Sequence, residues 1–453
     1  MSAPNKAIRL GINVVASGRH DAAWKTLDDP ASVSTDIDTF VRIAQIAERG
    51  KLDALFLSDG PGGLLPEAFT RAWRPLDPLT LHSALSQATR RIGLVVTASS
   101  IFGHPYTVAR QIASLDHVSK GRAAWNVITS QTPVALAAFG LGKGFEQQER
   151  YQRATEFVDI VTSLWDSLPT EAILADAANN VFVDAQQLHP VVFEGQHFSC
   201  TGTLAVPVGP QGRPVIFQAG QSEDSKAFGA RYADALFTGQ RILGSSRRFY
   251  ADVKGLARSF GRNPDHLLVM PGLFPILGDT EANAYKRKQE LDELLDHDQL
   301  RQTLARVLAL TPDDLPFDAP LPFDKINAVE DRVPLASRWP RKQLIDAARA
   351  HGWTVRQLLL QNPTGHRVVV GTPDQIADDI LQWVDGQAAD GFNLNVDVQT
   401  SGLEAIVDQL LPVLRKAGRF REEYTGHTLR DHLGLPAYRA AHALASSSAQ
   451  ETH

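Results

Sequence analysis

The pattern of hydrophobic and polar positions divides the chain into short apolar runs and longer amphipathic segments. Runs rich in Val, Ile and Leu predict strands, and segments with apolar residues three or four positions apart predict helices. The predicted strands cover residues 8–15, 53–57, 92–97, 123–128, 215–220, 235–237, 267–275 and 392–396. The predicted helices cover 35–49, 78–89, 105–118, 148–168, a segment from Ser222, 245–260, 280–295 and 403–417. This sustained alternation indicates a parallel sheet with helices outside it.

Eight strand-helix units favour an α/β fold of the (β/α)8, TIM-like barrel type. The alternative is a doubly wound open sheet, although nothing in the chain marks a reversal of strand order. We expect one barrel domain over 1–436 and a C-terminal tail over 437–453. Insertions are expected at about 171–206, as antiparallel hairpins, and at about 298–370, as a proline-broken helical lid over the site.

Composition limits the possible partners and compartment. Hydrophobic residues make up 43% of the 453 residues, charged residues 21%, and the formal net charge is −6. A mildly acidic chain does not suggest binding to nucleic acid or to an anionic membrane surface. The single Cys200 excludes an intramolecular disulfide framework and a cysteine metal cluster. Because neither a signal sequence nor a run of about 20 apolar residues is present, we expect a cytoplasmic protein without a membrane span.

Polar residues follow several of the predicted strands. The strand over 123–128 follows a tight turn at Gly121, contains Asn126 and runs into Thr129 and Ser130. The earlier strands end near Asp59, Ser99 and Ser100. Ligands of α/β folds bind at the carboxyl ends of the strands. These side chains are therefore candidate ligand contacts, although Asp59 taken alone is equally compatible with a helix cap or a loop acid.

The segment from Gln218 to Ser225 predicts a phosphate site. A strand runs into a small-residue turn, and Ser222 then opens a helix whose free N–H groups and positive dipole end suit a phosphate. Glu223 and Asp224 oppose this interpretation because acids in the first turn repel a phosphate unless they point away.

Common catalytic motifs are missing from the sequence. It contains no Gly-x-x-x-x-Gly-Lys-Ser/Thr loop, no His-Glu-x-x-His pair and no Gly-x-Ser-x-Gly elbow. The histidines are scattered, so no metal site is expected, and His20, His104 and His117 are interpreted as structural. The sequence does not point to a catalytic acid or base. An organic cofactor is therefore expected to carry the reaction.

Several segments together resemble one enzyme family. Residues 119–130 read Ser-Lys-Gly-Arg-Ala-Ala-Trp-Asn-Val-Ile-Thr-Ser, which is similar to the Ser-x-Gly-Arg-x-x-Trp-Asn-x-Val-Thr-Ser signature of the luciferase-like, two-component flavin monooxygenases. The closest branch is that of nitrilotriacetate monooxygenase component A and dibenzothiophene-sulfone monooxygenase. Further matches to this branch lie at residues 47–59, 78–81, 105–110, 150–157, 218–222 and 424–435.

The resemblance implies a bacterial luciferase-like barrel with FMN at its carboxyl end. Asp59, Ser99, Ser100 and Asn126 match segments that contact the flavin, and related enzymes often have a cis peptide bond, expected here near Ser99–Ser100. Tyr151 and Ser222 match phosphate contacts. Two positions depart from the family: Gln147 stands where a His is usual, and Ser225 stands where a Gly is usual. Both are kept as candidate cofactor-binding residues, with weaker phosphate binding as one consequence.

The resemblance also implies the activity. A separate flavin reductase supplies reduced FMN, which with O2 oxygenates a small organic substrate, such as a xenobiotic containing sulfur or nitrogen. The absence of a Gly-x-Gly-x-x-Gly motif agrees with electrons supplied from outside. The candidates for the pocket wall, which are equally compatible with plain core, are Trp24, Phe56, Phe102 and His104.

A homodimer or homotetramer is the expected assembly. Three alternatives remain at this stage: a flavin-degrading lyase of the same branch, a deazaflavin-dependent oxidoreductase on the same barrel, and a flavin-binding protein without catalysis.

Overall fold

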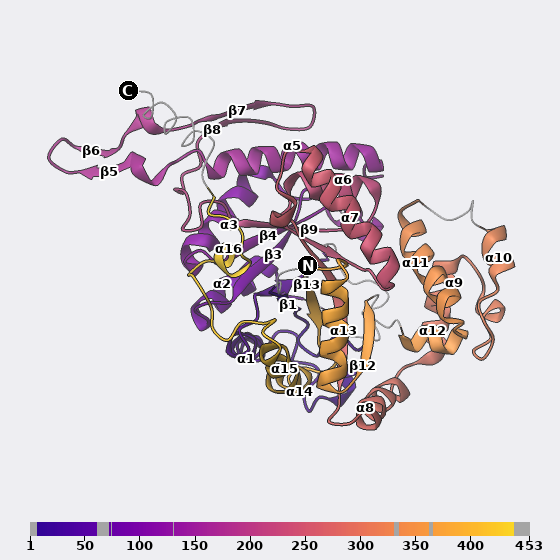
Figure 1. Cartoon of the computed structure of the whole chain (residues 1–453). Coiled ribbons are helices and arrows are strands. Elements are labelled where there is room, and N and C mark those ends of the chain that lie inside the picture. Colours follow the sequence, from indigo (N-terminus) through magenta and orange to yellow (C-terminus); the bar gives the residue numbers. More distant parts are fainter. Residues whose placement is uncertain are drawn as a thin grey trace.

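Eight parallel strands form a closed barrel in the computed structural model, which describes residues 7–60, 72–73, 75–129, 131–329, 335–361 and 366–438 (Figure 1). The barrel strands are β1 (Arg9–Asn13), β2 (Ala54–Leu57), β3 (Gly93–Ser99), β4 (Ala123–Ile128), β9 (Val215–Ala219), β10 (Ala235–Thr238), β11 (Leu268–Leu277) and β13 (Gly391–Asn395). Each pairs with the next around the ring, and the pairs β10–β11 and β1–β13 close it. The barrel prediction is therefore confirmed, and the open doubly wound sheet is excluded because that sheet would have two free edges.

Alternate residues along each strand face opposite sides of the barrel wall. Leu55 and Leu57 belong to the large outer core beneath the helices, whereas Phe56 packs inside the barrel against Phe217 and Phe237. The surrounding helices are α1 (Ile37–Arg49), α2 (Pro78–Ala88), α3 (Pro105–Ser119), α4 (Pro133–Ala138), α5 (Gln147–Trp165), α6 (Glu223–Tyr232), α7 (Leu243–Ser259), α8 (Glu281–Glu293), α13 (Pro373–Asp385), α14 (Ser401–Ala405) and α15 (Leu411–Lys416). No helix in these described parts is long and apolar enough to span a membrane.

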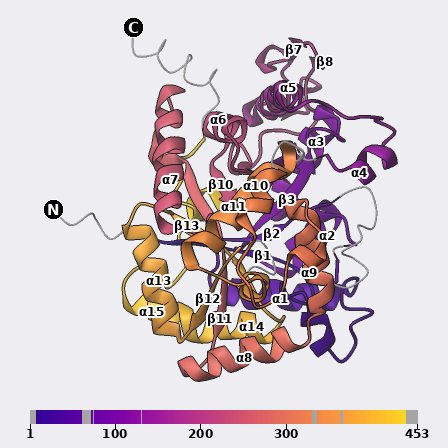
Figure 2. The same cartoon turned by 90° about the vertical axis from the view of Figure 1, so that its right-hand side faces the viewer.

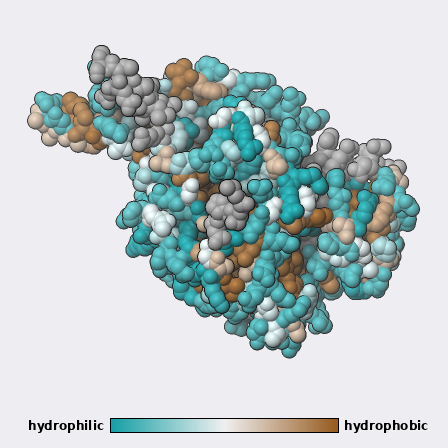
Figure 3. Space-filling model, viewed as in Figure 1, coloured by the Kyte–Doolittle hydropathy of each residue, from teal (hydrophilic) through white to brown (hydrophobic). Residues whose placement is uncertain are grey.

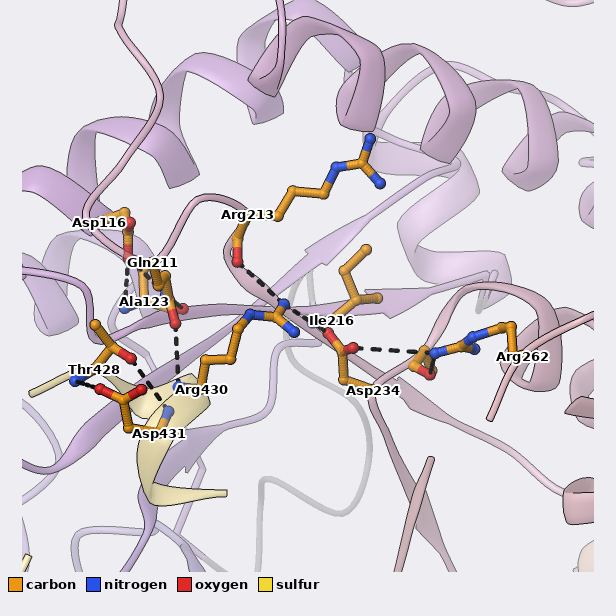
Figure 4. A network of polar contacts seen from close by, with 11 residues as sticks. Asp116, Ala123, Gln211, Arg213, Ile216, Asp234, Arg262, Thr428, Arg430 and Asp431 are labelled. Atoms are coloured by element: carbon orange, nitrogen blue, oxygen red, sulfur yellow. Dashed lines mark hydrogen bonds and ion pairs between the residues drawn. The ribbon is translucent and has the colours of Figure 1, made fainter. Parts of the chain in front are cut away.

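The segment 424–438, which we call the C-terminal cap, closes the amino-terminal end of the barrel. Its short helix α16 (Leu429–His432) places Leu429 in the inner core, where it packs onto Gly93 at the start of β3. Arg430 donates to the Asp234 carboxylate at 3.3 Å and to the Arg213 carbonyl at 3.2 Å, as Figure 4 shows. The opposite, carboxyl end of the barrel is therefore the end available for a ligand.

Two antiparallel hairpins interrupt the barrel between β4 and β9, as the sequence predicts. They are formed by β5 (Ile173–Asp176) with β6 (Val181–Val183), and by β7 (Val191–Glu194) with β8 (Ser199–Gly202). The first projects from the body of the molecule, whereas the second lies along α5, where Glu156 accepts from the backbone N–H groups of Gln196, His197 and Phe198 (Figure 1). The first hairpin carries exposed apolar side chains, among them Phe182 at 70% exposure, and brown residues mark its projecting end in Figure 3.

The second insertion forms a helical unit with a core of its own. Its helices are α9 (His297–Leu308), α10 (Phe323–Ala328), α11 (Leu335–His351) and α12 (Val355–Gln361). The unit stands beside the barrel in Figure 1 and in front of the barrel strands in Figure 2. Because it leaves the barrel after β11 and α8 and returns beside the last residues of β11, it lies at the carboxyl end of the barrel.

The last residues of the range expected for this insertion belong to the main sheet instead. Strand β12 (Arg367–Gly371) pairs in parallel with Leu273–Leu277, the part of β11 that extends beyond the barrel ring. The Val-Val-Val run that forms it is a sequence signal for a strand. Because this run lies at the end of a long irregular segment, the sequence analysis assigned it to the insertion and not to the sheet.

Candidate functional site

The inside of the barrel is lined by aromatic rings and by buried amides. Phe56, Phe217 and Phe237 supply the rings, with ring centroids 5.2 Å apart between Phe56 and Phe237. The amides are four buried asparagines on β1, β4 and β13, which we call the amide cluster. Its members are Asn13, Asn126, Asn393 and Asn395.

Several polar atoms of the amide cluster have no hydrogen-bond partner among the described residues. Asn13 donates to Asn395 at 3.0 Å, and Asn126 donates to the Thr97 hydroxyl at 3.0 Å. The Oδ1 atoms of Asn13 and Asn126 and both amide atoms of Asn393 are left without a partner. Buried polar groups are almost always hydrogen-bonded, so these atoms fit a polar ligand that enters the barrel. A flavin ring system carries the required donors and acceptors.

Gly272 on β11 makes room for a histidine inside the barrel. A Cβ atom at Gly272 would lie 2.1 Å from Nδ1 of His366, and the His366 ring stacks on Phe237 with centroids 5.2 Å apart. The next residue, Arg367, faces the other way and pairs with Asp379 on α13 at 2.6 Å. Because Gly272 pairs with Asn393 of β13, the segment that follows the helical insertion places an imidazole near Asn393 of the amide cluster.

The end of β3 forms a turn held by its own serines. The Ser99 hydroxyl accepts from the backbone N–H groups of Ile101 and Phe102, and the Ser100 hydroxyl donates to the Ile128 carbonyl at 3.1 Å. The cis peptide bond expected near Ser99–Ser100 is not found there, so this prediction is wrong. The cis peptide bond in the described part of the chain joins Gln399 to Thr400, after β13.

The predicted phosphate site is a junction between the N-termini of α5 and α6. Ser222 caps α6 by accepting from the Ser225 N–H, and the Ser225 side chain is buried, where its hydroxyl accepts from Gln218 at 2.8 Å. Its Oγ would lie 2.0 Å from a Cβ at Gly220, so Ser225 holds the turn together.

The acidic residues at this junction differ in orientation. Glu223 pairs with Lys226 at 2.7 Å and is directed along its own helix. Asp224 accepts from Gln147, the first residue of α5, at 2.5 Å. A carboxylate and a neutral amide therefore lie together where the family resemblance places a histidine.

Two further α5 residues stand beside this junction. Tyr151 contacts Phe228 of α6 with ring centroids 5.8 Å apart. Arg150 donates to the carbonyl of Thr129, just past β4, at 3.1 Å. Ser130, named with Asn126 and Thr129 in the sequence, lies outside the described residues.

The remaining candidates lie at different depths. Asp59 follows β2 and is half-buried. Phe56 is core, whereas Phe102 stacks on the exposed Phe139 with centroids 4.6 Å apart. Trp24 is half-buried and lies near Lys25, and His104 is exposed at the start of α3.

Two of the histidines interpreted as structural make fixed contacts. His20 is buried, its Nδ1 accepts from the Ala22 N–H and its Nε2 faces Asp292 at 3.2 Å. His117 contacts the Pro207 carbonyl at 2.9 Å.

The structure brings the strand-end candidates together on one arc. Ser99 ends β3, Asn126 lies within β4, and Asp59 and Ser222 follow β2 and β9; these four strands are neighbours in the ring. Sequence reasoning missed His366 and the amides of β1 and β13. The alternation Phe392-Asn393-Leu394-Asn395 is a signal that could have revealed the amides, because every second residue of a barrel strand faces inward.

The chain belongs to the luciferase-like monooxygenase family, whose model matches residues 14–390. It is 41% identical to N-acetyl-S-(2-succino)cysteine monooxygenase of Bacillus subtilis (strain 168), over 96% of this chain and 98% of the relative. It is 38% identical to nitrilotriacetate monooxygenase component A of Aminobacter aminovorans, over 95% and 97%.

A solved structure supports the same assignment. A riboflavin lyase crystallised with modified FMN and riboflavin has a TM-score of 0.81 and 28% identity to this chain, covering 95% of this chain and 97% of the lyase. The family and branch indicated by the sequence are confirmed.

Proposed function

We propose that this protein is an FMN-dependent monooxygenase that receives reduced FMN from a separate flavin reductase. With O2 it oxygenates a small organic substrate that contains sulfur or nitrogen. The observation that carries the proposal is the set of unpartnered amide atoms inside the barrel, together with the paired N-termini of α5 and α6 after β4 and β9. The names of two relatives support it: one acts on N-acetyl-S-(2-succino)cysteine, and the other is a component A, which implies a partner component.

The proposed roles follow from position. The phosphate is held by four residues that surround the α5–α6 junction: Gln147, Arg150, Tyr151 and Ser222. Asp59, Ser99, Ser100 and Asn126 border the ring system at the ends of β2, β3 and β4, and Ser225 shapes the phosphate turn. Reduced FMN, when bound, supplies the electrons that activate O2.

Residues of this chain complete the proposed pocket. The helical insertion covers the site and excludes water, which limits wasteful loss of reducing equivalents to hydrogen peroxide. His366 stands beside the amide cluster, where its imidazole can exchange a proton with a bound ligand. The Phe102 and Phe139 rings border the opening on the β3 side. We also propose a cytoplasmic homodimer or homotetramer, which the exposed apolar hairpin supports.

The test supplies reduced FMN and 18O2 to the protein with a panel of thioether and amine substrates. N-acetyl-S-(2-succino)cysteine and nitrilotriacetate are included in the panel. Mass spectrometry is expected to find one 18O atom in a product of at least one substrate. Formation of hydrogen peroxide alone, with every substrate unchanged, would count against a monooxygenase.

A flavin-degrading lyase is the second candidate, favoured by the similarity to the riboflavin lyase. The same reactions distinguish the two activities if the flavin is quantified at the end. A monooxygenase returns the flavin intact, whereas a lyase consumes it in proportion to turnover.

A further inference from the structure

Arg241 is a half-buried arginine in the loop between β10 and α7. Its Nε and Nη1 atoms are shielded from solvent and have no hydrogen-bond partner among the described residues. Burial is the single cause that shifts its pKa, lowering it to about 10, and no neighbouring carboxylate offsets this. The side chain therefore remains a cation at neutral pH, with no countercharge.

Other arginines that are buried to a similar or greater depth each have at least one partner, although Nε and Nη2 of Arg367 and Nε of Arg430 are unpaired within the described residues. Arg122 donates to several backbone carbonyls and to the Thr89 hydroxyl, and Arg367 pairs with Asp379. Arg430 pairs with Asp234. A buried charge without a partner is unfavourable, so an isolated guanidinium is expected where a ligand supplies the missing charge.

The position of Arg241 matches that interpretation. The loop leaves β10 at the carboxyl end of the barrel, the same end that carries Asp59, Ser99 and Ser222. The preceding residue, Gln240, is buried and donates to Gln221 at 3.2 Å and to Thr238 at 3.3 Å, which fixes the loop beside the turn after β9.

The helix that follows adds a second feature. At the first turn of α7, the N-cap residue Ile242 provides no side-chain acceptor, and that turn contains no acidic residue. The first N–H groups of a helix carry partial positive charge and bind anions. Arg241 stands two residues before Leu243, the first residue of α7, and a guanidinium fork matches the geometry of carboxylate and phosphate groups.

We propose that Arg241 and the N-terminus of α7 form a subsite for an oxyanion group of a bound ligand. The group is either a carboxylate of the substrate or the phosphate of the flavin. The inference rests on the proposed function only in placing both ligands at the carboxyl end of the barrel. It assigns a binding role to a residue outside the arc from β2 to β9.

The experiment measures ligand binding without turnover, with flavin-free protein for the flavins and FMN-loaded protein for the small anions. FMN and riboflavin are titrated by quenching of flavin fluorescence, and succinate and inorganic phosphate are titrated by calorimetry into FMN-loaded protein. The variants are Arg241→Gln and Arg241→Lys. The control, Arg248→Gln, removes the same charge from an exposed position on α7.

Each outcome identifies a source or rejects the subsite. If Arg241→Gln weakens FMN binding by about ten- to a hundredfold and leaves riboflavin within twofold, the oxyanion is the flavin phosphate. If both flavins bind as before and succinate or phosphate binding is lost, the oxyanion belongs to the substrate. Arg241→Lys is expected to lie between wild type and Arg241→Gln, because it keeps the charge without the fork.

The proposal is overturned if Arg241→Gln binds FMN, succinate and phosphate as the wild type does. It is also overturned if the wild type binds neither small anion and FMN binding is unchanged. Should Arg241→Gln fail to fold, wild-type protein is treated with phenylglyoxal and mapped by mass spectrometry. FMN or succinate is expected to protect Arg241 but not Arg248, and absence of protection by both rejects the subsite. Because no step requires O2, failure of the monooxygenase proposal leaves this result interpretable.

Discussion

At the scale of single residues, Asp224 is the side chain expected to oppose a phosphate most strongly at the proposed site. Its carboxylate accepts from Gln147 at the junction of α5 and α6, whereas Glu223 is neutralised by Lys226. We expect Asp224→Asn to tighten FMN binding by about three- to tenfold, because it removes a repulsive charge near the phosphate. Riboflavin, which lacks the phosphate, is expected to bind unchanged, and Glu223→Gln serves as the control. Equal effects on FMN and riboflavin, measured by fluorescence quenching, would contradict the placement of the phosphate.

Asn393 is expected to lower the stability of the protein and to contribute to ligand binding. Both of its amide atoms are buried and unpartnered within the described residues, which is unfavourable unless a ligand pairs with them. Asn393→Leu, of similar volume, is therefore expected to keep or raise the melting temperature while it weakens FMN binding or lowers substrate oxygenation at least tenfold. A variant that melts higher and works normally would show that the amide does not contact a ligand.

The sequence predicted the candidate residues of one arc and missed those outside it. Asp59, Ser99 and Asn126 could be found because each lies at or near the end of an apolar run, which marks the carboxyl end of a strand. His366 could not, because the helical insertion separates it in sequence from β11, the strand it packs against. The isolation of Arg241 depends on burial and on the absence of carboxylates nearby, and neither is visible in a sequence.

At the scale of elements, the helical insertion is coupled to the barrel through His366. A Cβ at Gly272 would overlap its ring, so Gly272→Ala is expected to displace His366 and to destabilise the protein by about 1–3 kcal/mol. Oxygenation of substrate is expected to fall, with more hydrogen peroxide formed for each reduced FMN consumed.

Gly255→Ala provides the matched control for this substitution. Gly255 lies within α7, and a Cβ there meets no atom within 4 Å. This variant is expected to gain about 0.5–1 kcal/mol, because alanine favours the helix. Chemical denaturation measures both changes. If folded Gly272→Ala still forms as much product for each O2 consumed as the wild type, His366 has no part in the proposed pocket.

The C-terminal cap is the second element whose position has consequences for the whole barrel. Leu429 is fully buried in the inner core, so Leu429→Ala is expected to cost about 2–5 kcal/mol in unfolding free energy. Because the cap lies at the end of the barrel opposite the proposed flavin site, FMN affinity is expected to stay within twofold while the protein remains folded. Loss of FMN affinity in a folded variant would contradict this expectation and would show that the cap affects binding at the opposite end of the barrel.

At the scale of the whole molecule, the barrel could be predicted because the order of elements was regular and each strand was bounded clearly. The expected strands and helices match the observed ones within a few residues, and the strand 123–128 matches in full. The pairing of β12 with the end of β11 could not be predicted from the sequence. It requires β11 to be longer than the neighbouring barrel strands, and the sequence does not show where those strands end relative to β11. Closure of the barrel was inferred from the number of strands, and the parallel pairing of β10 with β11 confirms it.

The stability of the whole chain is expected to depend on two buried histidines. Burial lowers the pKa of His82 to about 3 and that of His432 to about 4, whereas in the unfolded chain each titrates near 6.5. The folded state therefore keeps both rings neutral, and their contribution is complete above pH 6.5 and lost as the pH falls below it. Asp116 acts in the opposite direction, because burial raises its pKa to about 6 and its charged form is disfavoured in the folded state.

The two histidines change the unfolding free energy more than Asp116 does, because they are two groups and their pKa values are shifted further. Using about 1.4 kcal/mol for each pH unit and group, we expect the unfolding free energy to fall by about 3 kcal/mol between pH 7.5 and pH 5. His82→Gln keeps a donor for the Val95 carbonyl, which the ring contacts at 3.1 Å, but cannot take up a proton. Its loss between the same two pH values is expected to be smaller by about 2 kcal/mol, as measured by urea denaturation. An identical loss in wild type and His82→Gln would mean that His82 is already protonated, or exposed, in the folded protein.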